Sequence, residues 1–175
     1  LKKFRPNYKA VLMADADTGR VLFAEQEHRK VYPASLVKLM SVLLTFEAIE
    51  AGKTNLDEIV VTSTKASKIG GTQVFLKEGE EFTVRELLKA MIVRSANDVT
   101  LAMAEHVSGN EDSFVRLMNQ RAKELGMTHT EFHSPHGLPP SRGEKHNVST
   151  AYDLFLLARF ILHNHPQYLE WSAIE

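Results

Sequence analysis

Apolar residues form two short runs near the start of the chain and several longer runs with helical spacing. The two short runs lie within residues 9–26 on either side of "DADTG", where Gly19 can adopt the positive φ of a tight turn. Val11, Leu12 and Met13 are consecutive apolar residues, so both faces of their strand are expected to be covered. We therefore predict a core β-hairpin whose sheet is completed by further strands.

The longest apolar segment predicts a helix from about Ser35 to Ala51 that ends at Gly52. Pro33 stands just before it, at a position that favours helix entry. Apolar side chains occur almost all round this helix, which is typical of a buried helix.

Capping residues and apolar spacing predict the remaining elements. Thr83 and Glu86 form a capping box at the start of a helix. A strand-like segment is expected at 58–63, followed by a loop and a short polar–apolar stretch at 79–84. Helices are expected at 84–93, 99–107, 111–126 and 151–164, and a long Pro/Gly/His-rich loop at 127–148. One early hairpin followed mostly by helices indicates an α+β fold.

Composition narrows the class of protein. The 175 residues are 43% hydrophobic and 25% charged, which suits one globular domain or a large piece of one. The formal net charge of −1 is evenly spread, so we do not expect nucleic-acid binding. Cysteine is absent, which excludes disulfides and thiol nucleophiles. No apolar run approaches the ~20 residues of a membrane span, and no signal peptide is recognisable.

Ser35 and Lys38 are the first candidate for chemistry. Among eleven serines, only Ser35 has a lysine three positions later, on the same face of a helix. Serine needs an adjacent base to act as a nucleophile, and a buried lysine can supply one when its pKa falls. The helix N-terminus would stabilise negative charge at Ser35. The simpler alternative is a capping serine with a lysine that reaches the surface.

A second candidate is "RSANDV", at the junction of two predicted helices. A hydroxyl at Ser95 and an amide at Asn97 on a tight turn can point together into a cleft, where one relays a proton and the other holds a carbonyl. The alternative is an ordinary helix cap.

Together, the two motifs resemble the S-x-x-K and S-x-N signatures of the penicillin-recognising serine enzymes. The sequence is more closely similar to the D-alanyl-D-alanine carboxypeptidases, the low-molecular-mass penicillin-binding proteins. The likeness extends over nearly the whole chain, through "DADTGRVLFAEQEHRKVYPASLVKLMSVLLTFEAIEAG", "VRELLKAMIVRSANDVTLAMAEHVSG", "FVRLMNQRAKELGMTHTEFHSPHGL" and "STAYDLFLLARFIL".

The resemblance implies a role for each matching residue. Ser35 would be the acylated nucleophile, Lys38 its base and Ser95 a proton relay, while Asn97 would bind the substrate amide. His136, in "PHGL", would contact substrate at the rim of the cleft. The implied reaction releases the terminal D-alanine from a peptidoglycan stem peptide ending in D-Ala-D-Ala, without a cofactor. β-Lactams would acylate the same serine as inhibitors, and the site of action would be extracytoplasmic.

The third motif of that family, K-T-G, is absent from the sequence. The nearest text is Lys53-Thr54-Asn55, which ends in the wrong residue and precedes S-x-N. We therefore expect residues 1–175 to be a single, C-terminally truncated catalytic domain: the mostly helical portion of the β-lactamase/penicillin-binding transpeptidase-like fold, with its N-terminal hairpin but without the rest of the sheet. The exposed hairpin edge would then pair with a second copy or leave the chain poorly stable.

Two other functions remain open. A class A β-lactamase would prefer Asp at the position of Ala96 and would need a deacylating glutamate, for which Glu131 and Glu144 are poorly placed. A catalytically silent wall-binding module would keep the helices without the chemistry. His129, His133 and His136 lie close together in the sequence, but a metal site is not expected from loop histidines alone.

Overall fold

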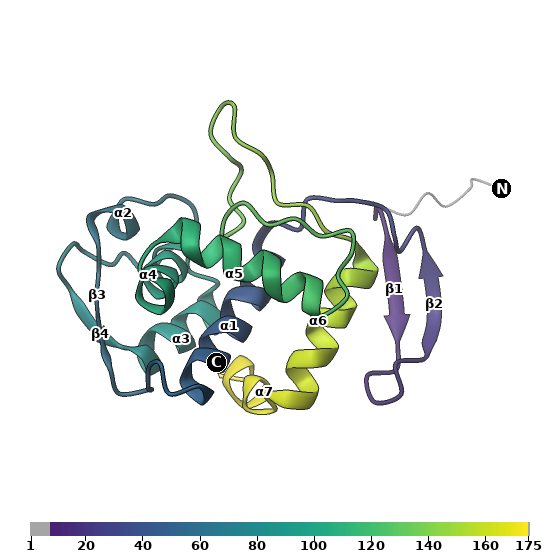
Figure 1. Cartoon of the computed structure of the whole chain (residues 1–175), viewed down its shortest axis with the longest axis horizontal. Coiled ribbons are helices and arrows are strands. Elements are labelled where there is room, and N and C mark those ends of the chain that lie inside the picture. Colours follow the sequence, from purple (N-terminus) through teal and green to yellow (C-terminus); the bar gives the residue numbers. More distant parts are fainter. Residues whose placement is uncertain (1–7, 175) are drawn as a thin grey trace.

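The computed structural model describes residues 8–174, in which helices predominate and two short sheets flank them (Figure 1). In chain order the elements are β1 (Val11–Ala14), β2 (Val21–Glu25), the 3₁₀ helix η1 (Ala34–Val37), α1 (Lys38–Glu50), β3 (Ile59–Val61), α2 (Thr64–Ser67), β4 (Glu81–Thr83), α3 (Val84–Arg94), α4 (Asn97–Ser108), α5 (Glu111–Glu124), α6 (Ala151–Asn164) and α7 (Gln167–Ser172). This mixture confirms the α+β prediction.

Helix α1 lies at the centre of the helical body (Figure 1). Val42 and Phe46 belong to a hydrophobic cluster shared with α3 and α4. Met40 and Leu43, both fully buried, belong to a second cluster shared with α5 and α6. Because α1 is covered on opposite sides, it can be apolar almost all round, as its sequence predicted.

The structure corrects the predicted first residue of two helices, α1 and α4. The first turn, where Ser35 lies, is the 3₁₀ helix η1, and α1 begins only at Lys38. Helix α4 begins at Asn97 instead of residue 99. Boundary shifts of this size are usual at helix ends, where 3₁₀ turns are common.

The hairpin β1–β2 corrects the prediction of a core hairpin. Its two strands pair antiparallel around the expected turn, with a register shift between Met13 and Ala14. Yet every residue of β2 is exposed, and Leu22 and Phe23, on opposite faces, are 54% and 49% exposed. Within residues 8–174 no third strand joins this sheet, and α6 packs against β1.

The hairpin turn is fixed to α6. Asp15 accepts hydrogen bonds from the backbone and hydroxyl of Thr18, and Gly19 takes a φ of 75°. The Arg159 side chain of α6 donates to two carbonyl groups of the turn, Ala16 and Asp17, at 2.7 and 2.8 Å. These bonds orient the hairpin at the edge of the molecule, where Figure 1 shows it beside α6.

The capping box at α3 is confirmed. The Thr83 hydroxyl accepts from the Glu86 backbone, and the Glu86 carboxylate accepts from the Thr83 backbone at 2.8 Å. The strand predicted within 58–63 forms β3, and the polar–apolar stretch at 79–84 supplies its partner, β4. The short helices α2 and α7 were not predicted, because neither is long enough to show a helical period in sequence.

Between α5 and α6 the chain forms the predicted long loop. Its regular pairing within the described residues consists of two isolated bridges, Val31 with Ser149 and Glu131 with Val148. The loop rises from the helices at the top of Figure 1 and returns across the first turn of α1. Among residues 8–174, none of the helices is long and apolar enough to cross a membrane.

Candidate active site

The Ser35 hydroxyl and the Lys38 amine meet as the sequence predicted. Lys38 Nζ donates to Ser35 Oγ at 3.2 Å across one turn of helix. Ser35 is exposed, whereas Lys38 is only 4% exposed. The lysine therefore does not reach the surface, and Ser35 makes no side-chain cap. A hydroxyl open to solvent thus contacts an amine that is hidden from solvent.

Burial changes the acid–base chemistry of Lys38. Removal of water from around the ammonium lowers the pKa of Lys38 from 10.5 to about 8. No ion pair of Lys38 with a carboxylate occurs within the described part of the chain, so no negative charge offsets this effect there. With a pKa of about 8, roughly a tenth of the lysines are neutral at pH 7 and able to accept a proton.

A segment of the long loop covers Lys38. The His136 carbonyl accepts a 2.8 Å hydrogen bond from Lys38 Nζ, and the neighbouring Pro135 carbonyl accepts one from the buried Ser41 hydroxyl at 2.8 Å. Asn147, also buried, binds Ser134 through its side-chain amide and so ties the two arms of the loop together. These contacts keep water away from the amine.

The backbone next to Ser35 is held in an unusual conformation. Ala34 has a φ of 48°, in the left-handed region that costs a non-glycine residue about 1–3 kcal/mol. Gly137, with a φ of 80°, packs on the Ala34 carbonyl so closely that a Cβ atom would lie 2.0 Å from that oxygen. A glycine is therefore required at position 137, where the loop packs on the strained backbone of Ala34 just before Ser35.

The second motif lies at the sharp junction between α3 and α4. Ser95 has a φ of 52° and a ψ of 37°, and within residues 8–174 its hydroxyl makes no hydrogen bond. Asn97 is buried and its amide nitrogen donates to the Gly70 carbonyl at 2.9 Å. The N-cap of α4 is Ala96, and no side chain caps this helix. Ser95 and Asn97 therefore do not act as ordinary helix caps.

Packing brings this second motif to the loop that covers Lys38. Gly71 lies against both Asn97 and Leu138, since a Cβ atom there would be 2.5 Å from the Asn97 amide nitrogen and 2.8 Å from a Leu138 methyl group. Leu138 follows His136 by two residues. The two motifs, 60 residues apart in sequence, are thus joined through the 135–138 segment.

Asp98 is a structural residue that the sequence analysis did not single out. It is fully buried, and its carboxylate accepts hydrogen bonds from the backbone of Val74 and Leu76 at 3.0–3.3 Å. Between them, Phe75 has a φ of 64° and is 77% exposed. Nothing in the sequence around Asp98, which directly follows S-x-N, indicated that it would bind the backbone of Val74 and Leu76.

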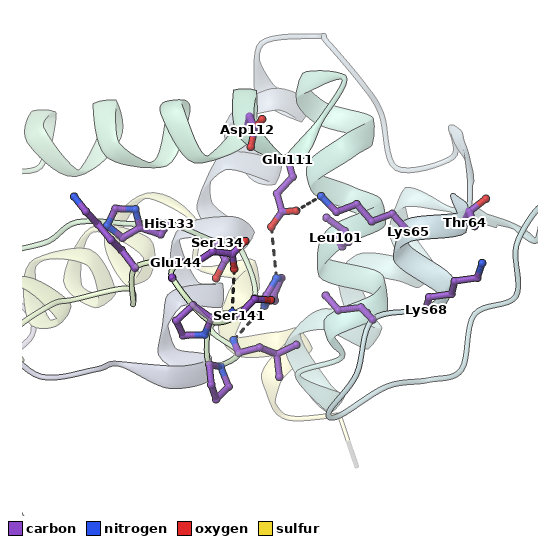
Figure 2. Close-up of a pocket in the computed structure, with 17 residues that line it drawn as sticks. Thr64, Lys65, Lys68, Leu101, Glu111, Asp112, His133, Ser134, Ser141 and Glu144 are labelled. Carbon is purple, nitrogen blue, oxygen red and sulfur yellow. Dashed lines mark hydrogen bonds and ion pairs between the residues drawn. The ribbon is translucent and has the colours of Figure 1, made fainter.

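The His136 ring contacts Glu111 and the Leu138 backbone, whereas its carbonyl contacts the Lys38 amine. Ring Nε2 lies 3.5 Å from Glu111 Oε1, and ring Nδ1 accepts from the Leu138 backbone at 3.1 Å. Glu111 in turn contacts Lys65 Nζ at 2.6 Å, as Figure 2 shows. A substrate contact by the ring stays a prediction. The structure adds the carbonyl of His136 and the carboxylate of Glu111, for which the sequence offered no signal.

The three loop histidines diverge to different neighbours. His129 lies near the His28 ring, His133 pairs with Glu131, and His136 faces Glu111. Among residues 8–174 no group of three or more histidine or acidic side chains is arranged to hold a metal ion.

Known proteins match this chain along nearly its whole length. The sequence model of the D-alanyl-D-alanine carboxypeptidase family, Peptidase S11, matches residues 6–175. D-alanyl-D-alanine carboxypeptidase DacF of Bacillus subtilis is 42% identical over 154 residues, which are 88% of this chain and 39% of that protein.

Solved structures give the same result. The D-alanyl-D-alanine carboxypeptidase DacD of Francisella tularensis has a TM-score of 0.90 and 34% identity, over 97% of this chain and 40% of that one. Penicillin-binding protein D2 of Listeria monocytogenes, in its cefotaxime-bound form, has a TM-score of 0.85 and 30% identity, over 97% of this chain and 69% of that one. The chain thus spans less than half the length of the Bacillus and Francisella proteins.

Proposed function

The chain belongs to the D-alanyl-D-alanine carboxypeptidase family, and from this premise we propose that Ser35 is the nucleophile of a serine-type D-Ala-D-Ala carboxypeptidase. Its substrate is a peptidoglycan stem peptide that ends in D-Ala-D-Ala. One observation carries the proposal: a buried lysine amine with a pKa of about 8 lies 3.2 Å from an exposed serine hydroxyl.

The chemistry follows from that contact. The neutral Lys38 amine takes the Ser35 proton while Oγ attacks the carbonyl of the penultimate D-alanine. The tetrahedral intermediate collapses, the C–N bond breaks, and the terminal D-alanine leaves with a proton on its nitrogen. Water then attacks the ester, and the proton it loses restores the Ser35 hydroxyl. No cofactor takes part in these steps.

Ser95 and Asn97 have supporting roles in this proposal. The Ser95 hydroxyl, without a partner in the described residues, is available to pass the proton to the leaving nitrogen. The Asn97 amide uses one donor on Gly70, which leaves a second N–H and a carbonyl oxygen for the substrate amide. The Leu138 and Gly71 contacts support this assignment, because they join both motifs to the segment above Lys38.

We propose that β-lactams acylate Ser35 and leave slowly, as inhibitors do. Penicillin-binding protein D2 of Listeria monocytogenes, whose structures are in ampicillin-bound and cefotaxime-bound forms, supports this expectation. The test is the intact mass of the chain after incubation with benzylpenicillin. A stable gain of one penicillin mass, absent in Ser35→Ala, is expected.

Other results of that experiment would favour the alternatives. Rapid consumption of penicillin without a lasting adduct would indicate a β-lactamase. A folded chain that gains no mass but still binds soluble wall fragments would indicate a wall-binding module. Either result would overturn the carboxypeptidase assignment.

We further propose that residues 1–175 are part of one catalytic domain that works outside the cytoplasmic membrane, where peptidoglycan lies. Support for the domain comes from the longer Bacillus and Francisella relatives and from the hairpin, which is apolar on both exposed faces. A two-stranded apolar hairpin with an open edge is prone to pair with another strand.

The chain by itself is accordingly expected to self-associate through β2. Sedimentation velocity over a concentration series should show a reversible increase in mass. Phe23→Lys, which places a charge on the exposed face, should suppress it, and a monomer at all concentrations would contradict the idea.

A further inference from the structure

Glu111 connects three segments that are distant in sequence. It is the first residue of α5, and its carboxylate contacts Lys65 of α2 at 2.6 Å and the His136 ring at 3.5 Å (Figure 2). The Glu111 and His136 side chains are only 16% and 12% exposed. His136 thus has two contacts: its ring contacts Glu111, and its backbone carbonyl accepts the hydrogen bond from Lys38.

We propose that Glu111 is a positioning residue for Lys38. By holding the His136 ring, it keeps the His136 carbonyl and the 135–138 segment closed over the lysine amine. This inference rests on the proposed function, because it concerns the base of the same reaction, and it assigns a role to a residue outside both sequence motifs.

The geometry explains why the carbonyl matters. A neutral amine has two N–H groups and one lone pair. When the His136 carbonyl accepts one N–H at 2.8 Å, the remaining groups of the amine are oriented toward Ser35 Oγ, 3.2 Å away. The same closed segment excludes water, and this burial is the cause of the lowered pKa of Lys38.

The closed position of the 135–138 segment depends on Glu111 because of where this residue lies. Glu111 is at the wall of an open cavity of about 1030 Å³ between α2, the start of α5 and the long loop. Once the carboxylate releases His136, water in this cavity can reach the segment above Lys38. Hydrogen bonds from His136 and then Lys65 keep the pKa of Glu111 below its usual value, so the Glu111 carboxylate is ionised at neutral pH.

The other acidic, basic and histidine side chains at this cavity lie on or next to the same three segments. They are Lys68 directly after α2, Asp112 of α5, and His133, Glu144 and Lys145 of the loop. Asp112 follows Glu111 in the first turn of α5 but makes no ion pair or side-chain hydrogen bond within residues 8–174. Asp112→Asn is therefore a matched control, with the same change of charge at the same end of the same helix.

The test compares Glu111→Gln with Asp112→Asn in two measurements. The first is the acylation rate with benzylpenicillin between pH 6 and 9.5. The second is the pKa of Lys38 itself, from the ¹³Cε shift of labelled lysine, assigned by its loss in Lys38→Met. If Glu111→Gln admits water to the amine, the pKa of Lys38 rises, and both midpoints move up by about half a unit or more.

A shift of that size lowers acylation at pH 7 about threefold and has little effect at pH 9.5. Lys65→Met, which leaves the Glu111–His136 contact in place, should shift the midpoints less. A general loss of structure would instead lower the rate equally at every pH.

The outcomes separate the two proposals. An upward shift of the Lys38 pKa in Glu111→Gln alone supports the positioning role, even if no variant is acylated and the carboxypeptidase proposal fails. An unchanged Lys38 pKa, or an equal shift in Asp112→Asn, overturns the positioning role while leaving acylation by the parent chain intact.

Discussion

The first turns of α1 and the hairpin β1–β2 are both rich in apolar residues, but the fold treats them in opposite ways. At the start of α1 even the lysine side chain of Lys38 is buried, because the long loop covers it and α1 packs against α3, α4, α5 and α6. In β2, apolar side chains of both faces stay exposed. Apolar composition alone therefore does not determine burial, because burial requires a partner surface within reach.

The comparison also concerns function. The chemistry proposed for Ser35 needs a dry amine, and Lys38 is accordingly only 4% exposed, with a pKa that burial lowers to about 8. The hairpin bears no such group and is attached mainly by its turn to α6. Changes in the two regions should differ accordingly, and four experiments measure by how much.

The largest effect is expected from Lys38→Met. Methionine fills a similar volume but cannot accept the Ser35 proton, so acylation by penicillin should fall by about a thousandfold. Stopped-flow acylation followed by mass spectrometry measures the rate, and circular dichroism checks the fold. A rate within tenfold of the parent would show that Lys38 is not the base.

Next is a pair of leucines, one from each region. Leu43 is fully buried in α1 and Leu22 is 54% exposed in β2. Leu43→Ala should lower the free energy of unfolding by about 2–5 kcal/mol, since it opens a cavity in the core, whereas Leu22→Ala should change it by about 0.5 kcal/mol or less. Urea denaturation measures both. Equal losses would mean that the hairpin is buried in solution.

The pH dependence of stability tests the buried charge directly. Because the pKa of Lys38 is about 8 when folded and 10.5 in its ordinary environment, the unfolded chain binds more protons between these values. Stability relative to Lys38→Met is therefore lowest below pH 8 and should recover by about 3 kcal/mol as the pH rises to 10.5. Paired urea titrations across this range measure the difference. A constant difference would show that the amine is hydrated.

The smallest of the four effects compares two glycines of the long loop. Gly137 and Gly143 both have a positive φ, but only at Gly137 would a Cβ atom collide with backbone, the Ala34 carbonyl. Gly143→Ala should destabilise by about 1 kcal/mol through its φ alone, and Gly137→Ala by about 2 kcal/mol or more. Thermal melts rank them, and the reverse order would show that the loop does not rest on Ala34.

Much of the fold was predictable because its signals are local. The Thr83–Glu86 capping box, the turn at Gly19 and the apolar helix after Ser35 each depend on residues only a few positions apart. The Ser35–Lys38 contact was predictable for the same reason, since one helical turn brings the third residue onto the same face.

The cover of the site could not be predicted in this way. Its main contacts are made by backbone carbonyl groups, as at His136 and Pro135, and every residue has such a group. Glu111 read as an ordinary acidic residue in a first helical turn, and its two partners lie 46 and 25 residues away in the chain. The hairpin was predicted to be buried because three apolar residues in a row suggest two covered faces, but no rule in the sequence names the covering partner.

Neighbouring residues were enough to predict the longer helices, the capping box at Thr83 and the one-turn pairing of Ser35 with Lys38, because helical and turn geometry are local. Long-range packing made the lysine dry, placed a distant carbonyl against it and left the hairpin exposed. Desolvation depends on what packs around a group from everywhere else in the chain, and that information is spread over the whole fold.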